Sequence, residues 1–105
     1  MIVGYRAILA PSELGLNFSA IVFVTLREGT RQAVSDFEAA LPDIAQIVEA
    51  QRLFGDPDYM LHVITRDLPA FQQLYDERLS ALPNVQRLSS TLVMKRVIQD
   101  RALAL

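Results

Sequence analysis

Runs of apolar residues, many of them β-branched, predict four strands along this chain, at residues 19–27, 44–54, 59–66 and 85–97. The first has so little alternation that we expect a central strand covered on both faces. The last is expected to start in earnest only after the polar Ser89-Ser90-Thr91. Apolar residues with 3.6-residue spacing predict two helices, one after the first strand and one after the third.

Thr30 is placed to cap the first helix and Asp67 the second, with Pro69 in the first turn of the latter. The apolar stripe of the first helix comprises Ala33, Val34, Phe37, Ala40 and Leu41. That of the second comprises Leu68, Phe71, Leu74, Tyr75, Leu79 and Leu82.

A short internal repeat supports this order of elements. Ala40-Leu41-Pro42-Asp43-Ile44 returns as Ala81-Leu82-Pro83-Asn84-Val85, each time between a helix pattern and a strand pattern. Because a helix rarely runs through the residue before a proline, both prolines should end a helix. A strand–helix–strand unit used twice gives βαββαβ. The predicted fold is therefore α+β, a ferredoxin-like sandwich with a four-stranded antiparallel sheet and two helices on one face.

The other face of such a sheet has no helix to cover it. With 51% apolar residues in 105, the chain has apolar surface to spare, so we expect a homodimer that pairs through the sheet. Residues 1–18 are surplus to the sandwich and predict a linker strand and turn, either added at an edge or reaching a neighbouring subunit. Residues 19–105 form the predicted domain.

Charge and composition narrow the function classes. Ten basic and twelve acidic residues leave a net charge of −2, which argues against this chain gripping nucleic acid by itself. No apolar run is long enough to span a membrane, and the N-terminus lacks a signal-peptide pattern. The absence of cysteine fits a reducing compartment, so a cytoplasmic location is expected.

The sequence contains few candidates for catalytic or metal-binding residues. The serines lack a G-x-S-x-G elbow, the four glycines are dispersed, and His62 has no second histidine or cysteine with which to hold a metal. We therefore expect no catalytic residue, metal or cofactor. His62, inside a strand, is interpreted first as a packed sheet residue.

The connection Gly55-Asp56-Pro57-Asp58-Tyr59 concentrates polar chemistry between two strands. Its carboxylates could receive a ligand ammonium, and free N–H groups near Gly55 could meet a carboxylate, which together would suit an α-amino acid. The same residues are those that any tight turn selects. From the residues alone, both interpretations stay open.

Three segments resemble the effector-binding half of the Lrp/AsnC family of transcription regulators. Residues 4–9 with 14–16 resemble that family's linker strand and turn, residues 55–61 its G-[DE]-x-D-[YF] loop, and residues 82–91 its L-P-G-V-x-x-x-x-T segment. The resemblance spans nearly the whole chain in the right order.

This resemblance implies an amino-acid-sensing and oligomerisation domain that dimerises through its sheet and assembles into rings such as octamers. It implies an effector site formed by Gly55, Asp56, Asp58 and Tyr59, with Ser90 and Thr91 as further candidates. DNA would be bound only through a helix-turn-helix domain that these residues do not include. The chain would be either a shortened regulator or a stand-alone domain. Asn84 replaces the family's turn glycine, and Pro57 stiffens the loop, so the effector's identity is not carried over.

Two alternatives remain at this stage. The architecture is also similar to that of small dimeric α/β-barrel monooxygenases, which would require His62 to line a cavity. A purely structural dimerisation domain is the other.

Overall fold

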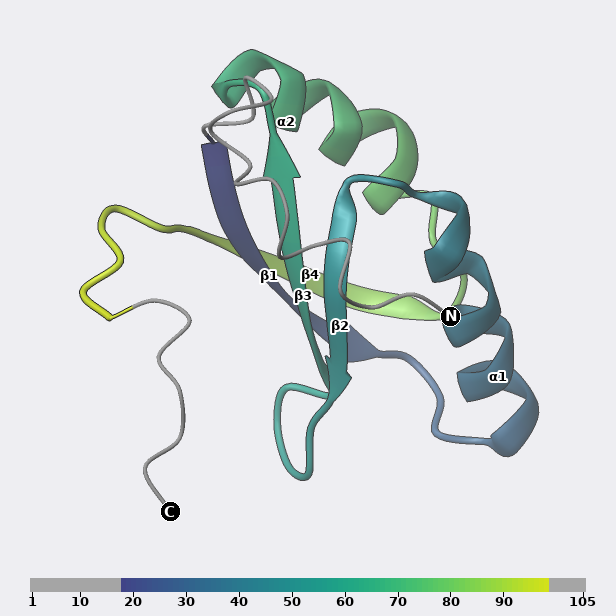
Figure 1. Ribbon diagram of the computed structural model, residues 1–105. Coiled ribbons are helices and arrows are strands. Elements are labelled where there is room, and N and C mark those ends of the chain that lie inside the picture. The colour runs from purple at the N-terminus through teal and green to yellow at the C-terminus, as the bar shows by residue number, and fades with distance from the viewer. Residues whose placement is uncertain (1–17, 99–105) are drawn as a thin grey trace, which may run out of the picture.

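The structure, a computed structural model, describes residues 18–98 and has the predicted βαββαβ order (Figure 1). The strands are β1 (Phe18–Leu26), β2 (Ile47–Arg52), β3 (Tyr59–Thr65) and β4 (Val85–Leu92). The helices are α1 (Arg31–Ala40) and α2 (Leu68–Leu74); a 3-10 turn, Leu41–Asp43, extends the first and a π-helical turn, Tyr75–Leu79, extends the second. The predicted linker strand and turn fall almost wholly on residues 1–17, outside the described residues.

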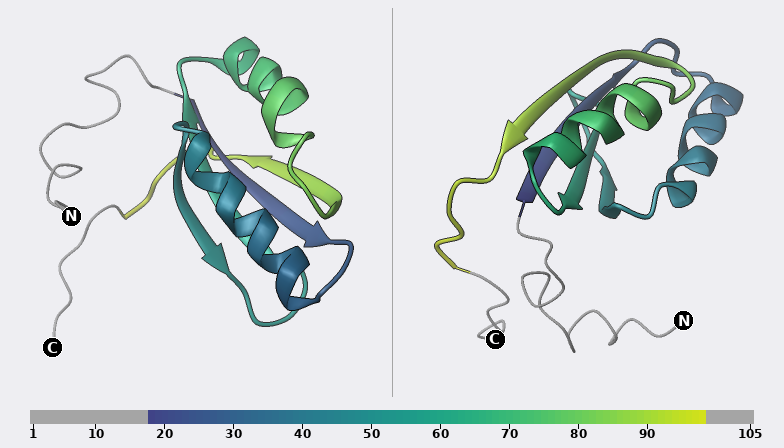
Figure 2. Two further views of the ribbon diagram at one scale, coloured as in Figure 1. Left: turned by 90° about the vertical axis from the view of Figure 1, so that its right-hand side faces the viewer. Right: turned by 90° about the horizontal axis from the view of Figure 1, so that it is seen from above.

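The sheet is antiparallel with the order β2-β3-β1-β4, so the first strand lies between the third and the last. Both helices lie on the same face, as the two views of Figure 2 show. The predicted ferredoxin-like sandwich is thus confirmed, and no helix of residues 18–98 lies on the sheet's second face.

The core lies between the sheet and the helices. Its fully buried side chains are Ala20, Val22, Val24, Phe37, Leu61, Val63 and Leu79. Along β1, buried residues alternate with half-buried ones. The expectation that this strand is covered on both faces is therefore wrong for a single chain, because only one face meets the helices.

Both helix starts agree with the sequence. The Thr30 hydroxyl accepts a hydrogen bond from the Ala33 N–H at 3.3 Å, and Asp67 Oδ1 accepts one from the Ala70 N–H at 2.9 Å. These bonds satisfy N–H groups that have no partner inside the helix. Leu68, predicted in the buried stripe of α2, is instead 42% exposed, because it lies in the first turn beyond the packed face.

The strand bounds differ from the prediction by one residue in β1 and β3 and by more in β2 and β4. β2 begins at Ile47 rather than Ile44, because the N–H groups of Ile44 and Ile47 close turns onto Leu41 and Ile44. β4 contains Ser89, Ser90 and Thr91 and ends at Leu92. These polar residues pair along β1, opposite Phe23, Val22 and Ile21. An edge strand tolerates them because much of its surface remains in water.

Asn84 precedes β4 with φ of 62°, in the left-handed region that asparagine adopts more readily than most residues. Its side chain accepts a hydrogen bond from the Glu28 N–H at 2.9 Å and donates one to the Glu28 carbonyl at 2.8 Å. The Asn84 carbonyl accepts a third from the Arg27 N–H. The turn before β4 is thereby tied to the connection between β1 and α1.

The helix-free face carries an apolar strip. Ile21 lies opposite His62 and Phe23 opposite Met60, on the two central strands. Ile64 continues the strip and is nearly buried. The face is therefore apolar at its centre, as expected from the sequence.

Candidate functional site

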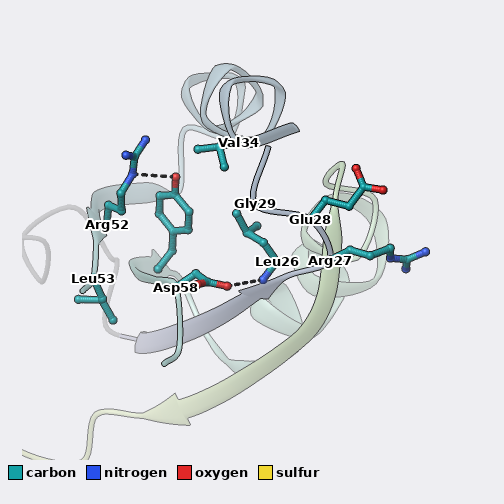
Figure 3. A pocket seen from close by; sticks show the side chains of 9 residues that line it. Leu26, Arg27, Glu28, Gly29, Val34, Arg52, Leu53 and Asp58 are labelled. Carbon is teal, nitrogen blue, oxygen red and sulfur yellow. Dashed lines mark hydrogen bonds between the residues drawn. The ribbon is translucent and has the colours of Figure 1, made fainter. Parts of the chain in front are cut away.

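A hollow of about 320 Å³ lies where the end of β1, the start of α1 and the β2–β3 connection meet (Figure 3). It is lined by Leu26, Arg27, Glu28, Gly29, Val34, Arg52, Leu53, Asp58 and Tyr59. Three segments far apart in the sequence thus bring both charge signs and apolar side chains to one place.

Asp58 is held by the end of β1. Since β3 begins at Tyr59, opposite Val24, β1 continues two residues beyond β3 while it remains paired with β4 on its other side. The Leu26 N–H is left without a strand partner there and donates to Asp58 Oδ2 at 2.7 Å. Among the described residues, the second carboxylate oxygen of Asp58, Oδ1, has no hydrogen-bond partner. The half-buried carboxylate is therefore fixed in place and still has an oxygen to offer.

The backbone around Asp58 is equally fixed. Its N–H donates to the Val24 carbonyl at 2.9 Å, and its carbonyl accepts from the Leu53 N–H at 2.8 Å. The Leu53–Asp58 bond closes the base of the connection that contains Gly55. The loop above this bond can vary without moving the carboxylate.

Tyr59 forms a wall of the hollow. Its ring is buried and packs against Phe37 with centroids 4.7 Å apart. Its hydroxyl donates a hydrogen bond to the Glu38 carboxylate and accepts one from Arg52 Nε at 3.2 Å. Burial is the main cause that raises the pKa of Tyr59, followed by its bond to Glu38, so the phenol stays protonated.

Arg52 and Glu38 form an ion pair above the Tyr59 hydroxyl. Arg52 Nη2 and Nε lie 2.5 and 3.0 Å from the same carboxylate oxygen, Glu38 Oε2. The hydrogen bond from Tyr59 and then those from Arg52 lower the pKa of Glu38. Both side chains are substantially exposed, so the pair is accessible from the hollow's mouth.

The structure brings together only some of the predicted site residues. Asp58 and Tyr59 line the hollow, whereas Gly55 and Asp56 lie exposed in the loop outside its lining. Gly55 has φ of 129°, which explains its glycine, and the Asp56–Pro57 peptide bond is cis.

Ser90 and Thr91 lie elsewhere in the chain. Ser90 lines a second hollow, of about 600 Å³, with residues of α2 and the turn after it. Thr91 pairs with Ile21 and shares the helix-free face with it. Within one chain, neither reaches the hollow that contains Asp58.

Arg52 and Glu38 were not among the residues predicted from the sequence. A charged residue at the end of a predicted strand and another on a helix give no signal by themselves. Only the packing of α1 over the ends of β2 and β3 places them together. Knowing that Tyr59 is buried would have required a partner for its hydroxyl, and that is the one signal that could have pointed to Glu38.

His62 lies on the helix-free face, away from both hollows. Its Nε2 is 2.6 Å from Ser19 Oγ and 3.2 Å from Arg96 Nη2. Burial first, and then the Arg96 charge, lower its pKa, against a smaller opposing effect of Glu49. Residues 18–98 hold no cluster of side chains suited to a metal ion. Within the described chain, His62 is thus a hydrogen-bonded residue of the sheet surface.

Comparison with known families decides what this domain is. A family model described as the Lrp/AsnC ligand binding domain matches residues 19–103, which is most of the chain. The chain belongs to the Lrp/AsnC family. The sequence resemblance is thereby confirmed, and the domain is the family's ligand-binding domain.

Curated Lrp/AsnC relatives include two proline dehydrogenase transcriptional activators. The one from Rhodobacter capsulatus is 35% identical over 102 residues, covering 97% of this chain and 66% of the relative. The one from Rhizobium radiobacter is 33% identical, covering 91% and 62%. The chain therefore spans just under two thirds of the length of these relatives.

A solved transcriptional regulator has the same fold. The chain is similar to a transcriptional regulator from Neisseria meningitidis in complex with L-methionine, with a TM-score of 0.83 and 26% identity. The match covers 92% of this chain and 62% of that one. Within the described residues, no helix has the length and apolar character needed to cross a bilayer.

Proposed function

We propose that this Lrp/AsnC domain senses an amino acid in the hollow and serves the oligomerisation of a transcription regulator. The observation that carries the proposal is the Asp58 carboxylate, which the Leu26 N–H holds by one oxygen while the other has no partner in the described chain. A carboxylate fixed in this way can accept a charge-assisted hydrogen bond from a ligand ammonium without rearranging.

The lining supports a zwitterionic ligand with an apolar part. Leu26, Val34 and Leu53 supply apolar surface, and Arg27 and Arg52 supply positive charge opposite in sign to Asp58. The Neisseria regulator named above is in complex with L-methionine, which has an ammonium group, a carboxylate and an apolar side chain. Nothing in the lining offers a nucleophile, so the proposal includes no catalysis.

The predicted site residues that do not line the hollow have a role in this proposal at its rim and in contacts between subunits. Gly55 and Asp56 form the rim, and Ser90 and Thr91 reach the site only from a neighbouring subunit. Phe54, beside this rim, is fully exposed, which is typical of a residue that an assembly covers. We propose homodimers paired through the apolar strip and a larger ring, such as an octamer, with contacts over the loop.

Any DNA binding belongs to a helix-turn-helix domain of the whole regulator, and its site of action is the cytoplasm. Ligand held between subunits would change the assembly, and the DNA response would follow by linkage. The curated activators are the support for this role.

Isothermal titration of the twenty amino acids into the protein tests the proposal. At least one should bind, and Asp58→Asn should weaken that binding by about tenfold or more, the usual value of a hydrogen bond between charged groups. Asp43→Asn, an equal charge change away from the hollow, should bind like the wild type. Light scattering with and without the binder measures the assembly. If no amino acid binds, the structural dimerisation domain is the better description.

A further inference from the structure

Arg52 has two sets of neighbours. It lines the hollow together with Tyr59, to whose hydroxyl it donates, and it is also paired with Glu38, which is not part of the lining. We infer that Arg52 is the residue that recognises the ligand's carboxylate, and that the carboxylate replaces Glu38 as its partner. This inference rests on the proposed function, because it names how the same hollow selects its ligand.

The guanidinium is only partly used in the structure. Nε and Nη2 both donate to one oxygen of Glu38, and Nη1 has no partner among residues 18–98. The two guanidinium donors therefore converge on one oxygen instead of forming the parallel two-oxygen arrangement that arginine makes with carboxylates. A ligand carboxylate can form that arrangement through Nη1 and Nη2.

The exchange leaves no group without a partner. The Arg52 side chain is 62% exposed. Because an exposed ion pair contributes little to stability, the release of Glu38 costs little free energy. The released Glu38 carboxylate keeps the hydrogen bond from the buried Tyr59 hydroxyl. Helix α1 therefore stays attached to β3 while Arg52 changes partner.

The other cation of the hollow is committed elsewhere. Arg27 Nη2 donates to the Val85 carbonyl at 3.2 Å, at the start of β4. Moving it would remove a bond between the residue after β1 and the start of β4. Moving Arg52 removes the exposed pair with Glu38 and the bond to the Tyr59 hydroxyl, which keeps its own bond to Glu38. Arg52 is therefore the better carboxylate receptor.

Strand pairing at the base of the loop fixes the two charges relative to each other. Arg52 ends β2 and pairs with Tyr59, and Asp58 immediately precedes β3. The Leu53–Asp58 backbone bond closes the loop between them. The paired strand ends thus present a cation on one side of the loop base and an anion on the other, whatever the conformation of the segment that includes Gly55.

Three variants test the inference by titration. The probes are L-methionine and L-methioninamide, which lacks the carboxylate; if the panel prefers another amino acid, that one and its amide are used. Arg52→Gln should weaken amino-acid binding about 10- to 100-fold and leave amide binding unchanged. The amino-acid affinity of Arg52→Lys should lie between those of the wild type and Arg52→Gln, since lysine keeps the positive charge but lacks the paired N–H donors of the guanidinium.

Glu38→Gln separates recognition from scaffolding. Because the amide competes less for Arg52, amino-acid binding should become several-fold tighter. If the Arg52–Glu38 pair only supported the structure of the hollow, amino-acid binding should be weaker in both Arg52→Gln and Glu38→Gln. Circular dichroism of each variant confirms that it is folded.

The outcomes distinguish the two proposals. Binding by Arg52→Gln that equals the wild type, or a loss in Glu38→Gln as large as that in Arg52→Gln, overturns the inference and leaves the proposed function standing. If the wild type binds none of the twenty amino acids, the proposed function fails and the inference fails with it.

Discussion

Asp58 has a structural task that can be separated from ligand binding by choice of substitution. Asp58→Ala removes the acceptor of the Leu26 N–H, a bond of 2.7 Å at a half-buried position. An N–H left without a partner costs about 1–3 kcal/mol, and the open hollow lets water replace part of the loss. We therefore expect the free energy of unfolding to fall by about 1–2 kcal/mol.

Asp58→Asn is the matched variant. Its amide oxygen can still accept from Leu26, so the free energy of unfolding should stay within about 0.5 kcal/mol of the wild type, while the charge is gone. Guanidinium unfolding at one fixed protein concentration measures both variants, because assembly makes stability depend on concentration. For a domain of this size the alanine variant should melt about 5–10 °C lower. Equal stability of the alanine variant and the wild type would refute the structural role of this hydrogen bond.

Three further predictions concern other parts of the fold. Asn84→Ala should lower the free energy of unfolding by about 2 kcal/mol, since it loses both side-chain bonds to Glu28 and keeps a left-handed φ; Asn84→Gly, free of that strain, should lose less in the same chemical denaturation. Phe37→Ala should cost about 3–5 kcal/mol because the ring is fully buried, and a loss below about 1 kcal/mol in calorimetry would contradict the core described above. His62 has a lowered folded pKa, so its contribution to stability is complete above its unfolded value of 6.5 and is lost as pH falls toward the folded value. His62→Asn should flatten the pH dependence of the melting temperature just below pH 6.5; an unchanged slope would exclude His62 as its source.

Elements whose reasons are local were predictable from the sequence. Thr30 and Asp67 predicted the two helix starts, because a capping residue is adjacent in the chain to the helix that it begins. The proline repeat likewise indicated where each helix would end. The βαββαβ order followed from these signals without any knowledge of contacts.

Features set by pairing between distant strands were not predictable in the same way. Ser89, Ser90 and Thr91 belong to β4 because β1 offers them hydrogen-bond partners, which no local pattern reveals. Asp58 was predicted as a site residue and lines the hollow, but its bond to Leu26 depends on how far β1 continues past β3. Arg52 and Glu38 meet only after α1 has packed on the sheet, so the sequence offered no reason to choose them.

The position of β1 between β3 and β4 also constrains how the domain matures on the ribosome. The first strand of the described residues is a central one, and its two partners emerge only later, with the Ala20–Leu92 pair joining the two ends of the described chain. Such non-local pairing slows folding and leaves a strand edge exposed in the meantime. A nascent chain stopped before Val85 would present the apolar β1 with one edge unpaired. Protection of that edge from aggregation therefore falls to the speed with which the last strand follows, or to a chaperone that holds the chain until it does.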